Sequence, residues 1–403
     1  MINKIIYIMI IALTFGSNFL SFSIGPFQLT LFRLLLIVAF VMTLLVKHKH
    51  PLDKKKYKLN VIPIIFAFSL FSVIFVKDLT NFLKYEFFIV TALMTFYVIS
   101  SFATNYEKLI KCIKAFNISI CIQAFIGLAE SILKQYFFVN EDIAFLYTRY
   151  GDFPPTAMLY NTNNFALLML FGVVICFSLL LGSKKGITKT IYLALLVLYS
   201  YLIFLTTSRA CLLGVVIVFF IFFFFYGKSF FKRLLLIIFG ISFVVIFFSY
   251  FQKYTDLSYY ADESRMTLVK NGLFFVGKTF GLGIGTGQAE YWLTYNFKYP
   301  VSVTALHNWF MELLVSFGVV AFVYYICVYF SYIKASFKMM KSGSNKRISA
   351  LGFGIFSFLL SFVIANTTVS NVMSLEWFWS TWILITVSIY LVKYSKDSRR
   401  QYE

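Results

Sequence analysis

Long blocks of apolar residues are the feature of this sequence that most restricts how the chain can fold. Three of them are Leu29–Val46, Ala210–Tyr226 and Leu234–Phe251. A helix that crosses the hydrocarbon of a bilayer needs about 20 mostly apolar residues, and these blocks approach that length. Only helices and closed barrels satisfy their backbone polar groups in lipid, and these blocks lack the polar alternation of barrel strands. The sequence therefore predicts an all-α polytopic integral membrane protein.

The low content of charge excludes a soluble domain. Only 13% of the 403 residues are charged, against about 25% in soluble globular chains. We expect one integral membrane domain over residues 1–403, with both termini on the same side. Its first apolar run has no small-residue cleavage site and is interpreted as a retained helix. The predicted helices, twelve in all, cover residues 4–22, 27–46, 59–76, 85–104, 112–131, 163–182, 189–205, 210–227, 234–251, 308–333, 348–368 and 375–393.

The positive charges are distributed unequally between the two predicted sides. The side that holds the N-terminus carries 25 of the 36 Lys and Arg residues and only four acidic residues. This is the positive-inside pattern, so both termini are predicted to be cytoplasmic. The net charge of +20 does not indicate nucleic acid, because the cations lie in short separate loops instead of on one folded face.

Tryptophan and cysteine show no sign of cofactor chemistry. The tryptophans fall in outer segments or at outer helix ends and are interpreted as an interfacial belt; they are Trp292, Trp309, Trp377, Trp379 and Trp382. The cysteines lie in or beside apolar blocks without CxxC pairing, which predicts membrane-packed thiols; they are Cys112, Cys121, Cys176, Cys211 and Cys327.

The longest outer segment, residues 252–306, has a varied composition that predicts a folded loop contributing to the active site. Within it, 261–276 predicts an amphipathic helix on the membrane surface, capped by Asp262 and carrying Arg265 near its N-terminal end. From the pattern alone, Arg265 is either functional or a solvated charge paired with Asp262 or Glu263.

A glycine-rich stretch, Gly281–Gln288, follows in the same segment. It is neither a Walker A motif nor GxGxxG. It predicts a turn in which backbone packs closely. A second interpretation is that backbone N–H groups around Gly283 and Gly285 cradle an anion.

Several charged residues lie near the outer ends of apolar blocks, where burial is costly and function is common. Arg209 sits in a short polar turn between two apolar helices and is interpreted as functional, with snorkelling to head groups as the alternative. Glu312 and Glu376 are further site candidates. For Arg33, a structural ion pair is favoured over catalysis.

His307 is the only histidine on the predicted outer side, because His48 and His50 lie in a basic cytoplasmic loop. Imidazole transfers protons near neutral pH. From its position at the start of a predicted helix, His307 is either a proton-transfer group or a helix-start residue that caps or snorkels.

These motifs together resemble the O-antigen polymerase/ligase family of GT-C-type glycosyltransferases. The resemblance rests on Ser208-Arg209-Ala210, Arg265, the glycine stretch and His307-Asn308 followed by a helix containing Gly318, in that order. The stretch 161–166 before the sixth predicted helix is also similar. One departure is Ala210-Cys211, where Gly-Ala is common in the family.

The resemblance implies a donor glycan on undecaprenyl diphosphate, an acceptor saccharide, and a site on the outer face of a bacterial cytoplasmic (inner) membrane. Arg209 and Arg265 would bind the diphosphate without a metal, and His307 would be the general base. No cofactor is expected, and other polysaccharide assembly proteins are candidate partners. The residues expected to bind substrate are Arg33, Asn308, Glu312, Gly283 and Gly285.

The resemblance leaves polymerase and ligase open, because both use the same donor. We expect a polymerase of a capsule, O-antigen or teichuronic-type polymer. A polysaccharide-lipid flippase or a secondary transporter is the alternative from another class. Those proteins are expected to show paired halves with helices broken at matching places, whereas here the polar residues gather on one side around one large loop.

Overall fold

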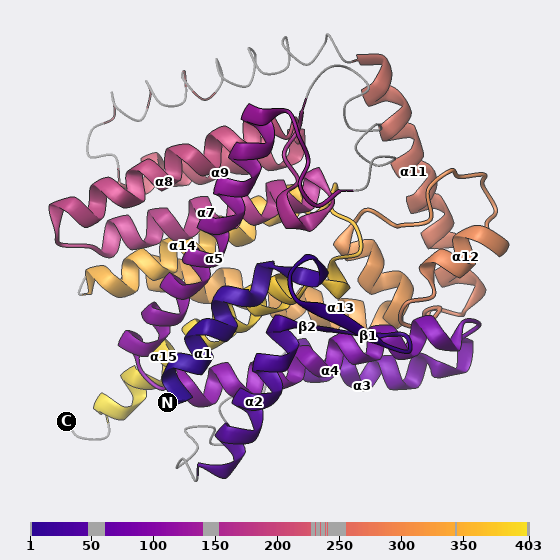
Figure 1. Ribbon diagram of the computed structural model, residues 1–403, viewed down its shortest axis with the longest axis horizontal. Helices are drawn as coiled ribbons and strands as arrows, with labels where there is room; N and C mark the ends of the chain where they lie inside the picture. Colours follow the sequence, from indigo (N-terminus) through magenta and orange to yellow (C-terminus); the bar gives the residue numbers. More distant parts are fainter. Residues whose placement is uncertain are drawn as a thin grey trace.

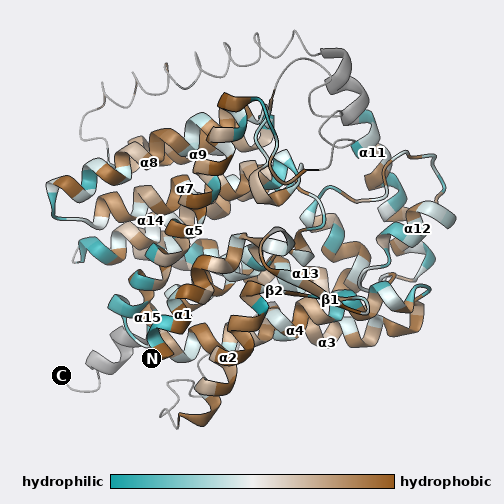
Figure 2. Cartoon of the chain, in the orientation of Figure 1, coloured by the Kyte–Doolittle hydropathy of each residue, from teal (hydrophilic) through white to brown (hydrophobic). Residues whose placement is uncertain are grey.

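The computed structural model describes residues 2–46, 61–139, 153–226, 230, 234, 238, 240, 255–342 and 345–400. The described part is a bundle of long helices, many of which lie roughly side by side (Figure 1). Apolar residues cover the helices, and polar residues gather at their ends and in the loops (Figure 2). The predicted all-α polytopic membrane architecture is thereby confirmed.

Seven of the described helices are long and apolar enough to cross a membrane. They are α4 (Leu79–Phe102), α5 (Tyr106–Leu133), α7 (Thr162–Gly182), α8 (Gly186–Leu205), α9 (Arg209–Tyr226), α13 (Trp309–Met340) and α14 (Lys346–Ala365). Shorter apolar helices are α1 (Ile2–Ile11) with the 3₁₀ turn η1 (Ala12–Thr14), α2 (Leu31–Leu45), and α3 (Val61–Phe71) with η3 (Ser72–Phe75). The helix predicted over 234–251 lies almost wholly outside the described residues, so the number twelve stays a prediction.

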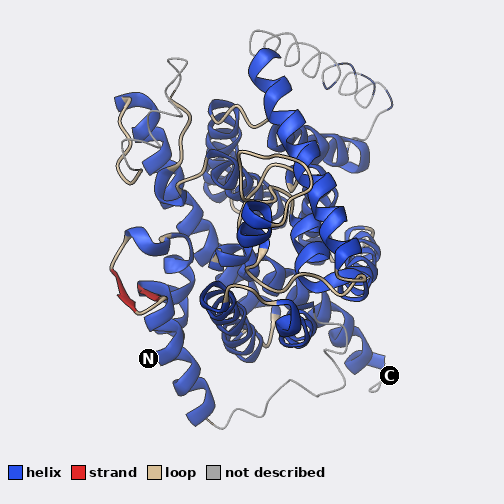
Figure 3. Ribbon diagram, turned by 90° about the vertical axis from the view of Figure 1, so that its right-hand side faces the viewer, coloured by secondary structure: helices blue, strands red, loops and turns tan. Residues whose placement is uncertain are grey.

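The beginning of the chain differs from the prediction of a helix over 4–22. After η1 the chain makes a second 3₁₀ turn, η2 (Gly16–Asn18), and an antiparallel hairpin of β1 (Ser21–Ile24) and β2 (Phe27–Thr30). Figure 3 shows this hairpin beside the helices. Gly16 and Gly25 adopt φ values of +55° and +57°, which glycine allows at little steric cost. The helix predicted from residue 27 therefore begins only at Leu31, with Thr30 as its N-cap.

The centre of the bundle is formed by α7, α14 and the last helix, α15 (Glu376–Arg400). Within their most apolar 18-residue windows, α7 is 78% and α14 is 72% buried inside the protein. The described face of α15 is also buried, and it carries hydroxyl side chains such as Ser380 and Thr386. Thr386 exchanges a hydrogen bond of 2.9 Å with Tyr332 of α13. Because α15 is surrounded by protein, it can hold polar residues that a lipid-facing helix would exclude.

The two ends of the bundle are identified by contacts between helix termini. At one end, the Tyr106 hydroxyl donates to the carbonyl of Arg347, and Ser349 lies 3.2 Å from the Tyr226 hydroxyl. This end therefore gathers the beginnings of α5 and α14 with the end of α9, and we call it the basic end. Its described cations are Lys108, Lys111, Lys114, Lys184, Lys185, Lys189, Lys338, Lys341, Lys346 and Arg347.

The opposite end carries the longer connections, and we call it the loop end. It includes α11 (Thr255–Lys278) and α12 (Ala289–Tyr295). These helices have a small core of their own, made of Leu268, Phe275, Ile284, Trp292, Leu293, Leu306 and Val315. The segment is therefore folded from Thr255 onward, while its outer location and its contribution to the active site stay predictions. The prediction that Asp262 caps the helix is wrong, because α11 begins seven residues earlier.

The glycine-rich stretch docks into a break in α13. Gly318 has φ +83° and ψ 178°, which interrupts the helix. The amide of Ile284 donates to the carbonyl of Val315 over 2.8 Å, and the amide of Val319 donates to the carbonyl of Gly281 over 2.8 Å. A Cβ added at Gly283 would lie 2.6 Å from the amide nitrogen of Gly318. The predicted close approach of backbone is confirmed.

The predicted tryptophan belt is wrong. Each of the five indoles is at most 5% exposed. The Trp309 indole donates to the Tyr325 hydroxyl over 2.9 Å, and the Trp379 indole donates to the carbonyl of Met373 over 2.7 Å. These side chains pack inside the protein against other helices, since Trp309 and Trp382 both contact the Tyr325 ring of α13. All five cysteines lie in the described part of the chain as free thiols; Cys112, Cys176 and Cys211 are buried as predicted, whereas Cys327 is exposed.

Candidate active site

The segment between α14 and α15, residues 366–375, is the centre of the loop end, and we call it the α14–α15 loop. Asn164 of α7 binds it at both polar atoms. The Asn164 side-chain amide donates to the carbonyl of Ser370 over 3.1 Å, and its oxygen accepts from the amide of Ser370 over 3.2 Å. Asn161 caps α7 and also lies 3.5 Å from the Ser370 hydroxyl. The stretch that contributed to the family resemblance therefore fixes this loop.

Glu312 holds the same loop from the other side. Its Oε1 accepts from the amide of Asn371 over 3.1 Å, and the side chain is 7% exposed. Asn371 has a φ of +51°, a left-handed conformation that asparagine tolerates better than most residues. Glu312 thus contacts the backbone of Asn371, and its role in binding substrate stays a prediction.

His307 lies directly before α13 with a φ of +48°. Burial lowers the pKa of this imidazole below its ordinary value, and the positive charge of Arg265 lowers it further. A hydrogen bond between the imidazole and the backbone of Thr368 opposes that shift. The imidazole of His307 therefore lies against the α14–α15 loop and within the electrostatic influence of Arg265. A lowered pKa keeps the imidazole neutral, and able to accept a proton, at neutral pH.

Arg209 begins α9 after a tight turn in which Thr207 has a φ of +55°. The short connection between α8 and α9 is the one predicted. Ser361 of α14 donates to the carbonyl of Gly214 over 3.0 Å. Since α9 and α14 run in opposite directions, this contact puts Arg209 level with the end of α14, where the α14–α15 loop begins. Arg209 is half-buried at the same end of the bundle as His307.

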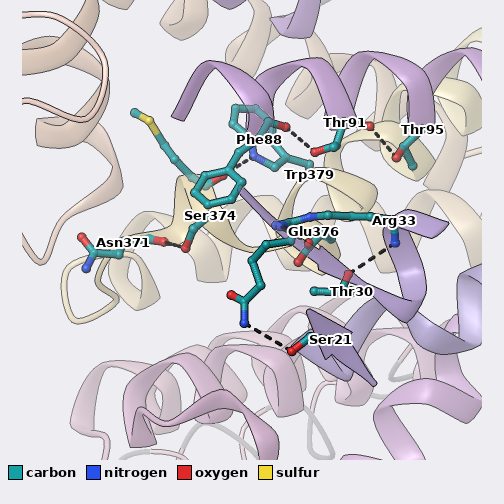
Figure 4. A network of polar contacts seen from close by, with 12 residues as sticks. Ser21, Thr30, Arg33, Phe88, Thr91, Thr95, Asn371, Ser374, Glu376 and Trp379 are labelled. Atoms are coloured by element: carbon teal, nitrogen blue, oxygen red, sulfur yellow. Dashed lines mark hydrogen bonds and ion pairs between the residues drawn. The ribbon is translucent and has the colours of Figure 1, made fainter. Parts of the chain in front are cut away.

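A cavity of about 450 Å³ lies beside the α14–α15 loop. Figure 4 shows the polar contacts around it, where Arg33 lies beside Glu376 with an N–O distance of 2.6 Å. The Arg33 guanidinium also faces the Phe87 and Phe88 rings, at 5.1 and 4.9 Å from their centroids. The predicted ion pair of Arg33 is confirmed. Further lining residues include Gln28, Lys84, Tyr85, Asn161, Asn371 and Trp377.

Three of the residues expected to bind substrate make structural contacts. Asn308 caps α13 by accepting from the amide of Met311 over 3.1 Å. The amide of Gly283 donates to the Thr279 hydroxyl over 3.2 Å, and the amide of Gly285 donates to the carbonyl of Ser316 over 3.2 Å. These amides are committed inside the protein, which favours the packing interpretation of the glycine stretch over the anion cradle.

Two lining residues of the cavity, Lys84 and Asn371, carry no signal in the sequence. Lys84 is one cation among several in predicted outer segments, and Asn371 lies in a short polar connection without a motif. Asn164 did have a signal, because it belongs to the stretch 161–166. Within the described ranges, no group of three or more His, Cys, Asp or Glu residues is arranged to hold a metal ion.

Comparison with known proteins agrees with this arrangement. Residues 194–326 match the family model described as O-antigen ligase, a range that includes Arg209, Arg265 and His307. The chain is also similar to the teichuronic acid biosynthesis protein TuaE of Bacillus subtilis (strain 168), with 25% identity over 417 aligned positions that span 98% of this chain and 85% of the relative. The chain is thus a multi-pass membrane protein whose residues 194–326 are similar to the O-antigen ligase family.

Proposed function

We propose that the protein is a polysaccharide polymerase that transfers a glycan from undecaprenyl diphosphate to a hydroxyl of an acceptor sugar. The observation that carries the proposal is that His307, which hydrogen-bonds the backbone of Thr368 in the α14–α15 loop, lies within the electrostatic influence of Arg265. A proton acceptor and a permanent cation are the two groups that this transfer needs beside each other. Arg209 adds a second cation at the same end of the bundle.

In the proposed reaction, the acceptor hydroxyl gives its proton to the imidazole of His307 while its oxygen attacks the anomeric carbon of the donor. The bond between that carbon and the phosphate oxygen breaks, and the diphosphate leaves with the bonding electron pair. Arg209 and Arg265 stabilise the negative charge that grows on it. Guanidinium suits this role because it stays charged and binds phosphate oxygens bidentately.

The hydrogen bond to Thr368 gives His307 a defined orientation. When one imidazole nitrogen is engaged by the backbone, the other is left to accept the proton, and its direction is set. The lowered pKa of His307 keeps that second nitrogen unprotonated at neutral pH. The imidazole is therefore neutral and oriented before the acceptor binds.

A ligase is the second candidate, and the description of the matched family model supports it. The name of the Bacillus subtilis relative, a protein of teichuronic acid biosynthesis, supports a role in building a polymer. The experiment is to incubate purified protein in detergent with an undecaprenyl-diphosphate-linked repeat. A ladder of longer lipid-linked products is expected. Transfer only to a saccharide without a carrier would indicate a ligase, and no transfer would favour a flippase or transporter.

We also propose that the reaction needs no metal, because two arginines supply the positive charge. Activity is expected to survive EDTA. Complete loss that Mg²⁺ or Mn²⁺ restores would contradict this part of the proposal.

The loop end is proposed to face outward, away from the cytoplasm, because of the cations at the basic end. Single cysteines at Lys185 and Lys341 should then be shielded from a membrane-impermeant thiol reagent in intact cells, while one at Lys298 should react. Labelling of Lys341→Cys from outside would invert the orientation.

A further inference from the structure

We propose that the cavity beside the α14–α15 loop is a binding site for an acidic saccharide and receives the acceptor sugar. The assignment to the acceptor rests on the proposed transferase function. The binding of an acidic sugar does not depend on it, and the two can be tested separately.

The size and lining of the cavity fit a short saccharide. Its volume of about 450 Å³ lies within the range of small-molecule sites, which is about 300–1,000 Å³. Amide side chains of Gln28, Asn161 and Asn371 line it together with the aromatic residues Tyr85 and Trp377. Amides donate to and accept from sugar hydroxyls, and aromatic rings pack against the apolar faces of sugar rings.

The charges around the cavity favour a negatively charged ligand. Its cations are Arg33 and Lys84, and its one carboxylate among the lining residues is that of Glu376. Glu376 is paired with Arg33 at 2.6 Å, and both side chains are buried, so this pair is close to neutral as a unit. Lys84 is exposed at the rim and is left to give the site a net positive charge. A carboxylate on the sugar would balance it.

The position of the cavity explains why its ligand would be the acceptor. Ser370 and Asn371 line the cavity, and Thr368 of the same loop bonds the imidazole of His307. The wall of the cavity and the support of the base are therefore one short piece of backbone.

The experiment measures sugar binding to the purified full-length protein in detergent by saturation-transfer difference NMR. The probes are cellobiouronic acid, a disaccharide with one carboxylate, and cellobiose, its neutral counterpart. Cellobiouronic acid is expected to bind more tightly. Lys84→Gln should weaken its binding about two- to fivefold, the size of one exposed charge pair, and leave cellobiose unchanged. Asn371→Gly keeps the left-handed backbone and should weaken both sugars.

Two controls keep binding and catalysis apart. Lys77→Gln makes the same change at an exposed lysine that does not line the cavity, and it should bind like wild type. His307→Ala should also bind both sugars normally while losing turnover. If the protein binds the sugars but transfers no glycan, the cavity proposal stands and the transferase proposal fails.

Three outcomes would overturn the cavity proposal. One is equal binding of the two disaccharides, which would remove the preference for an acid. Another is the absence of binding of both disaccharides, or binding of the disaccharides that neither Lys84→Gln nor Asn371→Gly weakens. The third is Lys84-dependent binding of inorganic diphosphate without sugar binding, which would assign the cavity to the carrier of a lipid-linked substrate instead.

Discussion

The two ends of the bundle connect their helices in different ways. At the basic end the connections that are described throughout, 103–105 and 183–185, are short, and asparagine caps start α5 and α14. Every left-handed backbone conformation in the described residues belongs to the other end or to the outer part of α13. The non-glycine positions are Leu20, Lys134, Ala157, Tyr160, Thr207, Phe280, His307 and Asn371.

This contrast shows where the molecule accommodates conformational strain. A non-glycine residue at positive φ costs of order 1 kcal/mol or more and persists only where its surroundings fix it. At the loop end, Asn164 and Glu312 provide such fixing for Ser370 and Asn371. The basic end sets the topology with unstrained turns, whereas the loop end holds its backbone in the shape that the site requires.

The largest effect is expected where the loop end depends on the break in α13. In Gly283→Ala the new Cβ would lie 2.6 Å from the amide nitrogen of Gly318, at a φ of +87°. Because the new Cβ would clash with backbone atoms, the clash cannot be relieved by the movement of a side chain. We expect loss of most folded protein, measured by size-exclusion chromatography of detergent extracts. Gly277→Ala is the control, since nothing lies within 4 Å of its added Cβ. Wild-type behaviour of Gly283→Ala would contradict the role of the docked stretch.

The second largest effect is expected from replacing the proposed general base. His307→Ala should lower the single-turnover rate by roughly 10²–10⁴-fold, the usual effect of removing a general base, with little change in donor affinity. Arg209→Ala and Arg265→Ala should weaken donor binding as well, and lysine at either position should not restore it fully. A His307→Ala protein that turns over normally, or that fails only because donor no longer binds, would leave His307 as a helix-start residue.

A matched pair of caps compares the two ends directly. Asn161 accepts from two amides at the start of α7, and Asn345 accepts from two amides at the start of α14. Replacement of either by alanine should cost about 0.5–2 kcal/mol of stability, seen as similar shifts in melting temperature. Only Asn161→Ala should also reduce turnover, because Asn161 lines the cavity and contacts Ser370. Equal loss of activity in both variants would contradict the proposal that only the cap at the loop end supports the site.

The smallest effect is a shift in pH dependence. Burial and then Arg265 lower the pKa of His307, and a base must be neutral to act, so the acid limb of the rate should lie below the ordinary imidazole pKa. Arg265→Gln removes the second cause and should move that limb to higher pH while burial still holds it down. The measurement is the normalised rate against pH. Lys270→Gln on the same helix should leave the limb unchanged; a shift there, or none in Arg265→Gln, would contradict the pairing.

Most of the architecture could be predicted, because a membrane helix is recognised from the length of its apolar segment. The predicted starts of α7, α9, α13 and α15 lie within one residue of those observed. The hairpin at 21–30 was missed because its apolar residues Phe22, Phe27 and Leu29 were assigned to the flanking helices, although Gly25-Pro26 marks a turn. The tryptophans were misplaced because their burial depends on contacts with side chains of other helices, which no local pattern reports.

A site residue could be predicted where its type is rare in that part of the chain. It could not be predicted where residues of its type are common. His307 stood out as the one imidazole on its side, and Arg33 as a cation inside an apolar block. Lys84 and Asn371 have ordinary neighbours, and their position on one cavity follows from the tertiary meeting of α4 with the α14–α15 loop. The roles of Glu312 and Gly283 became clear only from the backbone groups that they contact.

The break at Gly318 also defines the unit by which this protein can be recombined with its relatives. The carbonyls of Val315 and Ser316 and the amide of Val319 are completed by the stretch 281–285, and in an apolar setting each such group is costly to leave unpaired. A chimera that exchanges only the segment before α13 would pair one protein's stretch with another's helix. The exchange unit therefore extends across the apparent boundary between loop and helix, and the crossover belongs after Val319.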